Sequence, residues 1–357
     1  MAVAEQALTQ MQDFQLLQKQ LEAVKKQNIA VLGDGQVFVK RTANGMIRSV
    51  KGSVTLSEQS GDIAYIYPKT MTTSKGFNKA NQIAGLSIIT PEKLQLPNGD
   101  IVVNPFPMVE PRSGSIGKVW VKKMAIGYSP TGVLVVTSAT LLYDVRMYFV
   151  QDVLKKVGKV AAAGTLTMEF GLNIVKETEY GIFVDSGDPK RPQAFIRIDD
   201  SGLGILIELS HPDIIKAVET YVQKKLFAER NAQSIAERLV MSKHPALSNI
   251  AYVEATGPDK AKVAKVPVVG FVHDFNQDQL LDIAKQAEQG GEIVVNGQKA
   301  QVIDAGVIEA SAEEMMAERD DEEVVHEAQV VDATVTPVPD AQPVKPVTQF
   351  STGGGLW

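Results

Sequence analysis

Two long runs rich in β-branched residues constrain the fold of this chain more than any other feature. They cover residues 115–126 and 131–143, and only the turn sequence Gly-Tyr-Ser-Pro at 127–130 separates them. Val, Ile and Thr favour strands, whereas Gly and Pro favour turns. Strands joined by so short a connection run in opposite directions. We therefore expect these two runs to form an antiparallel hairpin.

Shorter strands are predicted on both sides of this hairpin. Asn44-Gly45 and Asn98-Gly99 are hairpin signals, because both residue types tolerate a positive φ angle. The stretch Asn-Pro-Phe-Pro at 104–107 is expected to break any regular element, since proline donates no main-chain hydrogen bond. Further strand-like runs are residues 37–39, 63–67, 101–103, 165–175, 181–185, 193–198 and 203–209.

Several segments have the apolar spacing or the end signals of helices, and they are residues 4–27, 74–86, 145–157, 213–242 and 276–289. The clearest helix is 213–242. Ser210 and Asp213 have the spacing of a capping box, Pro212 suits a first turn, and His244-Pro245 ends the pattern. Helices interspersed with antiparallel strands and hairpins predict an α+β fold.

With 357 residues, the chain is long enough for two domains or for one large domain with appendages. We expect an N-terminal helix (1–27), an α+β core (28–245), a small α/β unit (246–310) and a disordered tail (311–357). The small unit should hold a strand at 264–272, a helix, and a hairpin at 291–303 about Asn296-Gly297. The tail has too few regularly spaced bulky apolar residues to fold alone.

Charge is distributed unevenly along the chain. The whole chain carries −6, and residues 313–345 hold ten acidic residues against two basic ones, a balance of −8, which leaves +2 for the rest. Within that rest, residues 36–160 contain sixteen Lys and Arg against seven Asp and Glu, a balance of +9. Such a surplus is either ordinary solvated surface or a binding surface for an anionic partner.

Several classes of chemistry lack their residues. There is no cysteine, which excludes disulfides, thiol nucleophiles and cysteine-held metals. The four histidines have no second ligand at metal-site spacing, and neither a phosphate-binding glycine loop nor Gly-x-Ser-x-Gly occurs. We therefore expect no metal, no cofactor and no catalytic residues. An enzyme whose site is assembled from unconnected residues remains open as a third hypothesis.

The expected cellular compartment follows from two kinds of segment that the sequence does not show, a signal peptide and a membrane span. The Gln-rich start, residues 1–20, has neither the basic region nor the apolar run of a signal peptide. No stretch approaches the ~18 apolar residues of a membrane span. We expect a soluble cytoplasmic protein.

The best candidate for binding lies in the first strand of the central hairpin. On a strand, Lys118, Trp120 and Lys122 share one face, while Lys123 points to the other, and Tyr128 occupies the following turn. Cations around an aromatic ring suit single-stranded nucleic acid, because the cations meet phosphates and the ring stacks on a base. The alternative is an edge strand guarded by lysines, with the tryptophan half buried. Lys75 and Lys79 could extend the surface.

The tail ends in apolar residues after its acidic part, and these are Phe350, Leu356 and Trp357. This design is similar to the tails of single-stranded-DNA-binding proteins, which recruit partners and compete with DNA. In those proteins the acidic cluster lies nearer to the terminus than residues 320–323 do here. The similarity implies a nuclease or replication partner for the tail.

Residues 74–86, 118–123 and 125–128 together resemble the phage recombination proteins of the RecT-like single-strand annealing class. Residues 228–238 are similar in placement to the basic helix late in that core, so the resemblance implies roles for Arg230 and Arg238. It covers roughly residues 60–245. The helix-rich segment usual before the core is replaced here by strands. The resemblance implies ATP-independent annealing of complementary DNA strands on rings or filaments of the protein.

Two hypotheses from different classes follow. The first is a single-stranded DNA-binding and annealing protein of phage or mobile-element recombination, acting as a homo-oligomer. The alternative is a structural or assembly protein of a phage particle, in which the strands, the N-terminal helix and the tail make subunit contacts.

Overall fold

The computed structural model describes residues 36–42, 45–66, 68–111, 113–178, 181–258, 260–271, 273, 275–295, 298–311 and 314–315. The chain divides into two compact units, Met1–Asp320 and Asp321–Trp357, and all described residues lie in the first. The predicted helix 4–27, Phe350, Leu356 and Trp357 lie outside the described residues, as does nearly all of the tail 311–357.

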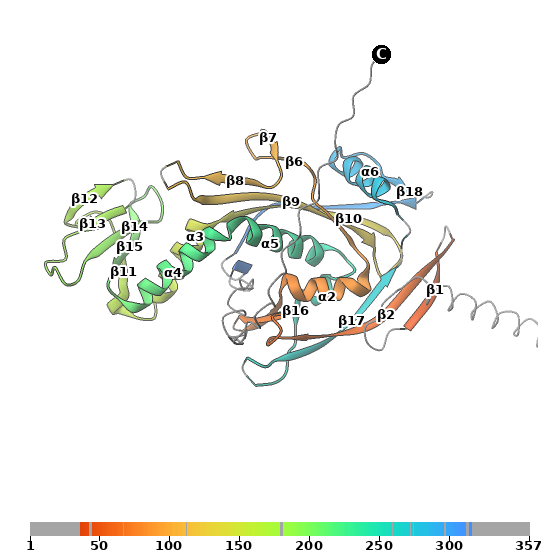
Figure 1. The fold of residues 1–357 in the computed structure, drawn as a ribbon, viewed down its shortest axis with the longest axis horizontal. Coiled ribbons are helices and arrows are strands. Elements are labelled where there is room, and N and C mark those ends of the chain that lie inside the picture. The colour runs from red at the N-terminus through yellow and green to blue at the C-terminus, as the bar shows by residue number, and fades with distance from the viewer. Residues whose placement is uncertain are drawn as a thin grey trace, which may run out of the picture. The chain divides into compact units, whose positions relative to one another are not determined.

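The described part has an α+β architecture, as predicted, and its central sheet is built on the predicted hairpin (Figure 1). Strands β9 (Ile116–Tyr128) and β10 (Leu134–Asp144) pair antiparallel, from Leu134 opposite Tyr128 to Asp144 opposite Lys118. β20 (Gln301–Glu309) joins the far side of β10 in parallel. β5 (Ser87–Ile89) and β8 (Phe106–Val109) pair with the other side of β9.

Helices cover the two faces of this sheet unequally. On one face, Val119, Val121 and other small apolar side chains pack against Ile235 and its neighbours on α5 (Ala228–Lys243). On the other face, α6 (Gln277–Glu288) packs against the end of β9 that holds Met124 and Ile126. Figure 1 shows α5 below the sheet and α6 above one end of it. None of the described helices therefore covers the middle of β9 on the α6 side.

A second sheet has β2 (Gly45–Ser57) between β1 (Gln36–Thr42) and β17 (Val263–Phe271). Thr42 lies opposite Gly45, which confirms the predicted hairpin, although its two connecting residues lie outside the described part. α2 (Ser74–Ala84) crosses β17 so closely that a Cβ atom on Gly270 would lie 1.7 Å from the carbonyl oxygen of Ile83. A small neighbouring sheet contains β3 (Ile63–Ile66), β4 (Lys69–Thr72) and β16 (Tyr252–Val253).

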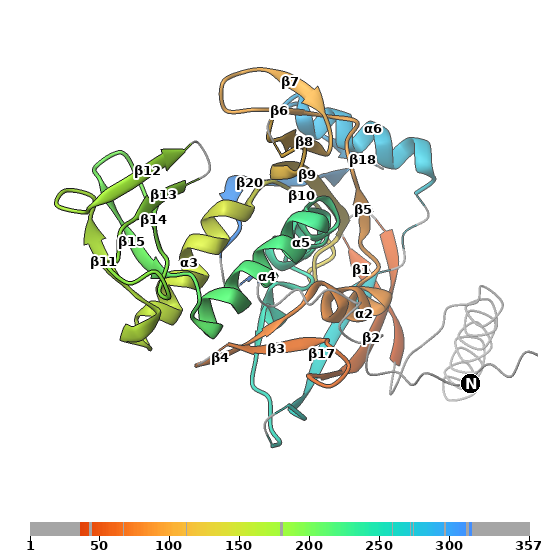
Figure 2. The same cartoon turned by 60° about the vertical axis from the view of Figure 1, so that its left-hand side comes forward.

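A third sheet has the order β11-β15-β14-β13-β12, with β11 (Gly164–Met168), β12 (Ile174–Thr178), β13 (Gly181–Val184), β14 (Gln193–Arg197) and β15 (Leu203–Glu208). α3 (Val145–Val157) and α4 (Pro212–Leu226) lie side by side and share an apolar cluster with it (Figure 2). Two-stranded pairs join β6 (Lys93–Gln95) to β7 (Ile101–Val103) and β18 (Val294–Val295) to β19 (Gln298–Lys299). Short 3₁₀ turns occupy Ala161–Ala163 and Ser248–Ile250.

Four local predictions were wrong. The helix predicted over 213–242 is two helices, α4 and α5, separated at Phe227, which has φ −108° and ψ 18°. Its first residue is capped by His211, whose Nδ1 accepts from the amide of Asp213, while Ser210 instead donates its hydroxyl to Glu208. The other two errors concern strands: a turn with a positive φ at Gly171 divides residues 165–175, and residues 106–109 pair with β9.

Strands of the expected C-terminal unit belong to sheets that begin earlier in the chain. β17 pairs with β2, and β20 pairs with β10, so these two strands complete sheets whose other members precede residue 145. The next residues also pack on the body. Ser311 and Glu314 cap each other's main-chain amides, and Met315 is buried in the cluster around α5.

Candidate functional site

The open face of the central sheet holds a cross-strand row of large side chains. Lys118, Trp120 and Lys122 point to the face opposite α5, because side chains alternate along β9. Trp120 lies directly between Phe106 on β8 and Leu142 on β10. All three members of the row are partly exposed. The row Phe106–Trp120–Leu142 thus forms an accessible aromatic and apolar strip across three strands.

Two lysines flank this row, and each contacts a carboxylate. The ammonium group of Lys118 lies 2.8 Å from Asp144, and that of Lys122 lies 3.0 Å from Glu288 at the end of α6. Asp144 also accepts from the amide of Met147 at the start of α3, so its charge is shared with a helix N-terminus. Both ion pairs remain partly exposed. The face is therefore amphipathic with its charges nearly balanced.

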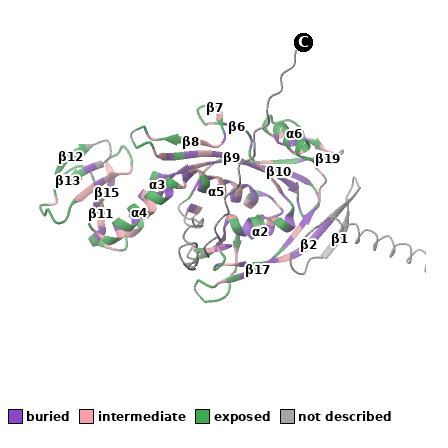
Figure 3. Cartoon of the chain, in the orientation of Figure 1, coloured by how far each residue is buried: buried purple, intermediate pink, exposed green. Residues whose placement is uncertain are grey.

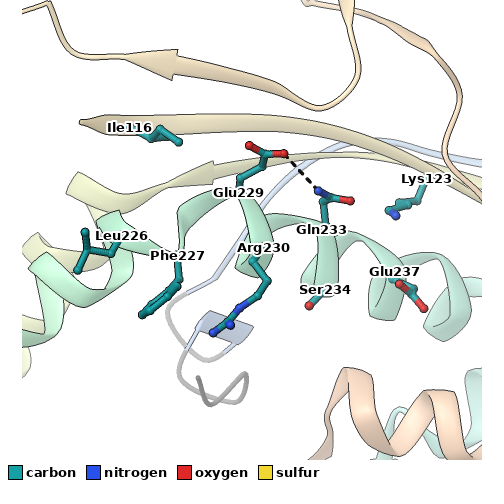
Figure 4. Close-up of a pocket in the computed structure, with 9 residues that line it drawn as sticks. All are labelled: Ile116, Lys123, Leu226, Phe227, Glu229, Arg230, Gln233, Ser234 and Glu237. Carbon is teal, nitrogen blue, oxygen red and sulfur yellow. Dashed lines mark hydrogen bonds between the residues drawn. The ribbon is translucent and has the colours of Figure 1, made fainter. Parts of the chain in front are cut away.

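Lys123 points to the opposite side of the sheet, into an open groove of about 480 Å³ between β9 and α5 (Figure 4). It is only 7% exposed, and burial lowers the pKa of its ammonium group, an effect that the charge of Glu237 opposes. In Figure 4 Lys123 lies on the side of Gln233 and Glu237, whereas Arg230 and Phe227 point away from β9. The Arg230 guanidinium lies 4.5 Å from the Phe227 ring centroid.

The remaining predicted residues are distributed over other parts of the body. Lys75 is exposed on α2, and Lys79 on the same helix bonds the buried Asp62 at 2.8 Å. Tyr128 packs against Phe271 and Phe275 with ring centroids 6.1 and 6.2 Å apart. Arg238 is buried on α5 and ion-paired with Glu314. Tyr128, Lys79 and Arg238 thus make contacts that hold the fold together.

Sequence reasoning missed Phe106 and Leu142, the neighbours of Trp120 in the row. Phe106 stands between two prolines in a stretch that was expected to be irregular, and Leu142 joins the row only through the register of β10 against β9. The alternation of β10 alone could have placed Leu142 on one face, but not opposite Trp120.

Comparison of the chain with protein-family models, with curated proteins and with solved structures gives no significant match. Among the described residues, no three potential metal-ligating side chains gather at one place. In the same part of the chain, every helix is too short or too polar to cross a bilayer.

Proposed function

We propose that this chain is a cytoplasmic protein that binds single-stranded DNA and anneals complementary strands in phage or mobile-element recombination. The observation that carries the proposal is the row Phe106–Trp120–Leu142, flanked by Lys118 and Lys122, on a sheet face that no described helix covers there. Stacking of a base on an exposed aromatic ring stabilises binding by about 1–3 kcal/mol, with little dependence on sequence. A row of this kind presents such a platform.

The two ion pairs limit how much the lysine charges contribute to the proposed affinity for DNA. A phosphate group has to compete with Asp144 for Lys118, and with Glu288 for Lys122. Two lysines neutralise at most two phosphates, so the slope of log affinity against log salt should not be steeper than about −1.4. Stacking therefore supplies most of the affinity, and the charges mainly fix the path of the backbone.

The proposal extends to partners. Annealing requires no nucleotide hydrolysis, which agrees with the lack of a phosphate-binding loop in the sequence. The apolar end of the tail, with Phe350, Leu356 and Trp357, would recruit a nuclease or replication protein, and several copies of the chain would act together on DNA.

A gel-shift titration with a single-stranded oligonucleotide over a salt series tests the proposal. Trp120→Ala should weaken binding by about 5- to 150-fold, the equivalent of losing one stacked base. Lys118→Met should make the salt slope shallower by about 0.7. Lys243→Met is the matched control, because Lys243 is an exposed lysine on α5, on the other side of the sheet. Absence of binding at low salt, or equal affinity of the Trp120→Ala variant, overturns the proposal.

One observation favours the second candidate, a structural or assembly protein of a phage particle. Phe170 stands in the turn between β11 and β12 and is 96% exposed, and Val175 nearby is also largely exposed. Exposed apolar side chains at a sheet edge are typical of subunit contacts. Negative-stain images with and without DNA distinguish the candidates, since an assembly protein forms particles or fibres without DNA.

A further inference from the structure

Helix α4 has apolar side chains on two neighbouring faces. Its inner face packs Ile214 and Ala217 into the cluster shared with α3 and the third sheet. Its outer face carries four large apolar residues that are exposed to solvent, and Figure 3 shows exposed positions along α4 in green. They are Ile215, Val218, Val222 and Leu226, exposed by 46%, 41%, 50% and 72%. We call these four residues the outer stripe.

The outer stripe distinguishes α4 from the other described helices. α2 and α5 expose no large apolar side chain, α3 exposes Met147 and Leu154, and α6 exposes Leu281. The stripe residues follow one another at intervals of three, four and four, the spacing at which side chains form one ridge along a helix. Such a ridge is the surface that pairs with another helix in ridges-into-grooves packing.

The stripe is complementary to itself. Its two larger side chains, Ile215 and Leu226, stand at its ends, and two valines stand between them. In an antiparallel pair of identical helices related by a two-fold axis, Ile215 meets the partner's Leu226, and Val218 meets the partner's Val222. Every stripe residue then gains an apolar neighbour of matching size. We infer that α4 is a self-association surface whose partner is α4 of a second copy of this chain.

The size of the stripe sets the strength of this contact. Four partly exposed aliphatic side chains with their flanks form a patch on the order of 300–600 Å² per copy. Two such patches bury at most about 1,200 Å², the lower limit for a specific interface. The pair should therefore exchange rapidly and be half formed at micromolar rather than nanomolar concentration. The four stripe residues carry no charge, so they offer nothing to a phosphate group, and this argues against nucleic acid as the occupant.

The first test measures the mass of the full chain by sedimentation, without nucleic acid, from about 1 to 100 µM. Wild-type protein should shift from monomer to dimer over this range. Val222→Glu should raise the midpoint, the protein concentration at which half of the chains are dimeric, by at least 100-fold, because it places two carboxylates in an apolar contact. Gln223→Glu adds the same charge to the next residue, which is exposed beside the stripe, and should leave the midpoint unchanged. Wild-type protein that stays monomeric at 100 µM, or equal behaviour of both variants, overturns the inference.

A second test keeps the helix intact and reports its orientation. The chain has no cysteine, so single-cysteine variants report only on the introduced positions. A short bismaleimide crosslinker should join Val218→Cys to Val222→Cys in a mixture more efficiently than either variant to itself, as antiparallel pairing requires. Preferential crosslinking of each variant to itself, or no crosslinking, contradicts the inference. Since no DNA is present, failure of either test leaves the proposed DNA binding unaffected.

Discussion

The side-chain amide of Asn104 makes both main-chain hydrogen bonds of Lys122. Its Oδ1 accepts from the Lys122 amide at 2.9 Å, and its Nδ2 donates to the Lys122 carbonyl at 2.8 Å and to the Pro91 carbonyl at 2.7 Å. The pairing of β9 with β8 ends at Trp120, and its pairing with β5 begins at Met124. Lys122 lies in the gap between these two paired parts of β9. Asn104 therefore takes the place of a neighbouring strand next to the proposed stacking row.

Replacing Asn104 with Ala should lower the free energy of unfolding by roughly 2–3 kcal/mol, because main-chain groups of Lys122 and Pro91 lose their partners in a partly buried place. Urea denaturation measures this loss. Asn98→Ala is the control, since the Asn98 side chain bonds only the exposed turn residue Asp100, and it should change stability by less than about 0.5 kcal/mol. Equal effects of the two substitutions would contradict the assigned role of Asn104.

Stability should fall on mild acidification because of His244. This residue is fully buried, its Nδ1 accepts from the Ala246 amide, and burial lowers its pKa from 6.5 to about 4. Between pH 6.5 and 4 the unfolded chain binds a proton that the folded chain does not, so stability decreases as the pH falls through this window. The full loss is about 3 kcal/mol.

Urea denaturation at pH 7 and pH 5 detects this effect when wild type is compared with His244→Gln. The variant should be less stable at pH 7 but should lose less on going to pH 5. An identical pH dependence in both proteins would show that carboxylates elsewhere cause the acid sensitivity.

Gly270→Ala should destabilise the protein by about 3 kcal/mol or more, since the added Cβ would meet the carbonyl oxygen of Ile83 at 1.7 Å, and main-chain atoms cannot rotate away. Gly291→Ala is the control, because its nearest neighbour would be the carbonyl oxygen of Gln286 at 3.7 Å, an ordinary contact. Thermal unfolding distinguishes the two. A tolerated alanine at 270 would mean that α2 and β17 lie further apart.

Lys123→Met should stabilise the protein by roughly 1–2 kcal/mol at pH 7, because the substitution removes a buried charge and keeps a similar volume. The lowered pKa of Lys123 means that the folded chain releases its proton before the unfolded chain does. Wild-type stability should therefore gain from a pH rise toward 10.5, and the variant should lack this gain. Denaturation at pH 7 and pH 9.5 checks both statements. A less stable variant would indicate that the ammonium group has a favourable partner.

The sequence predicts elements whose determinants lie within one local window. Alternation and a turn of four residues were enough for the β9–β10 hairpin, and the apolar spacing of residues 145–157 gave α3 with the bounds that the structure has. The break at Phe227 was missed because no glycine or proline marks it and the apolar pattern continues into α5. The His211 cap was missed because a histidine ring nitrogen seldom takes the role of a serine or aspartate oxygen.

Contacts between distant segments could not be predicted. Nothing local in residues 301–309 indicates that they pair in parallel with β10, or that β17 lies beside β2. The candidate face shows the same limit. Alternation placed Trp120 with two lysines, but Glu288, which contacts one of them, lies on α6, far along the chain. The balanced charge of the face is therefore a property of the tertiary structure and not of the local sequence.

Because β2 pairs with β17, the sheet that contains β2 cannot be completed until late in the synthesis of the chain. A ribosome that has completed β2 at Ser57 must add more than two hundred further residues before Val263 begins the strand that closes its free edge. At roughly 5–20 residues per second, this edge stays without its partner for about 10–40 s. β10 likewise waits for β20, which is the last of the described strands to be made. A nascent chain that stalls before residue 263 thus exposes the unpaired edges of β2 and β10 to other nascent chains on the same mRNA.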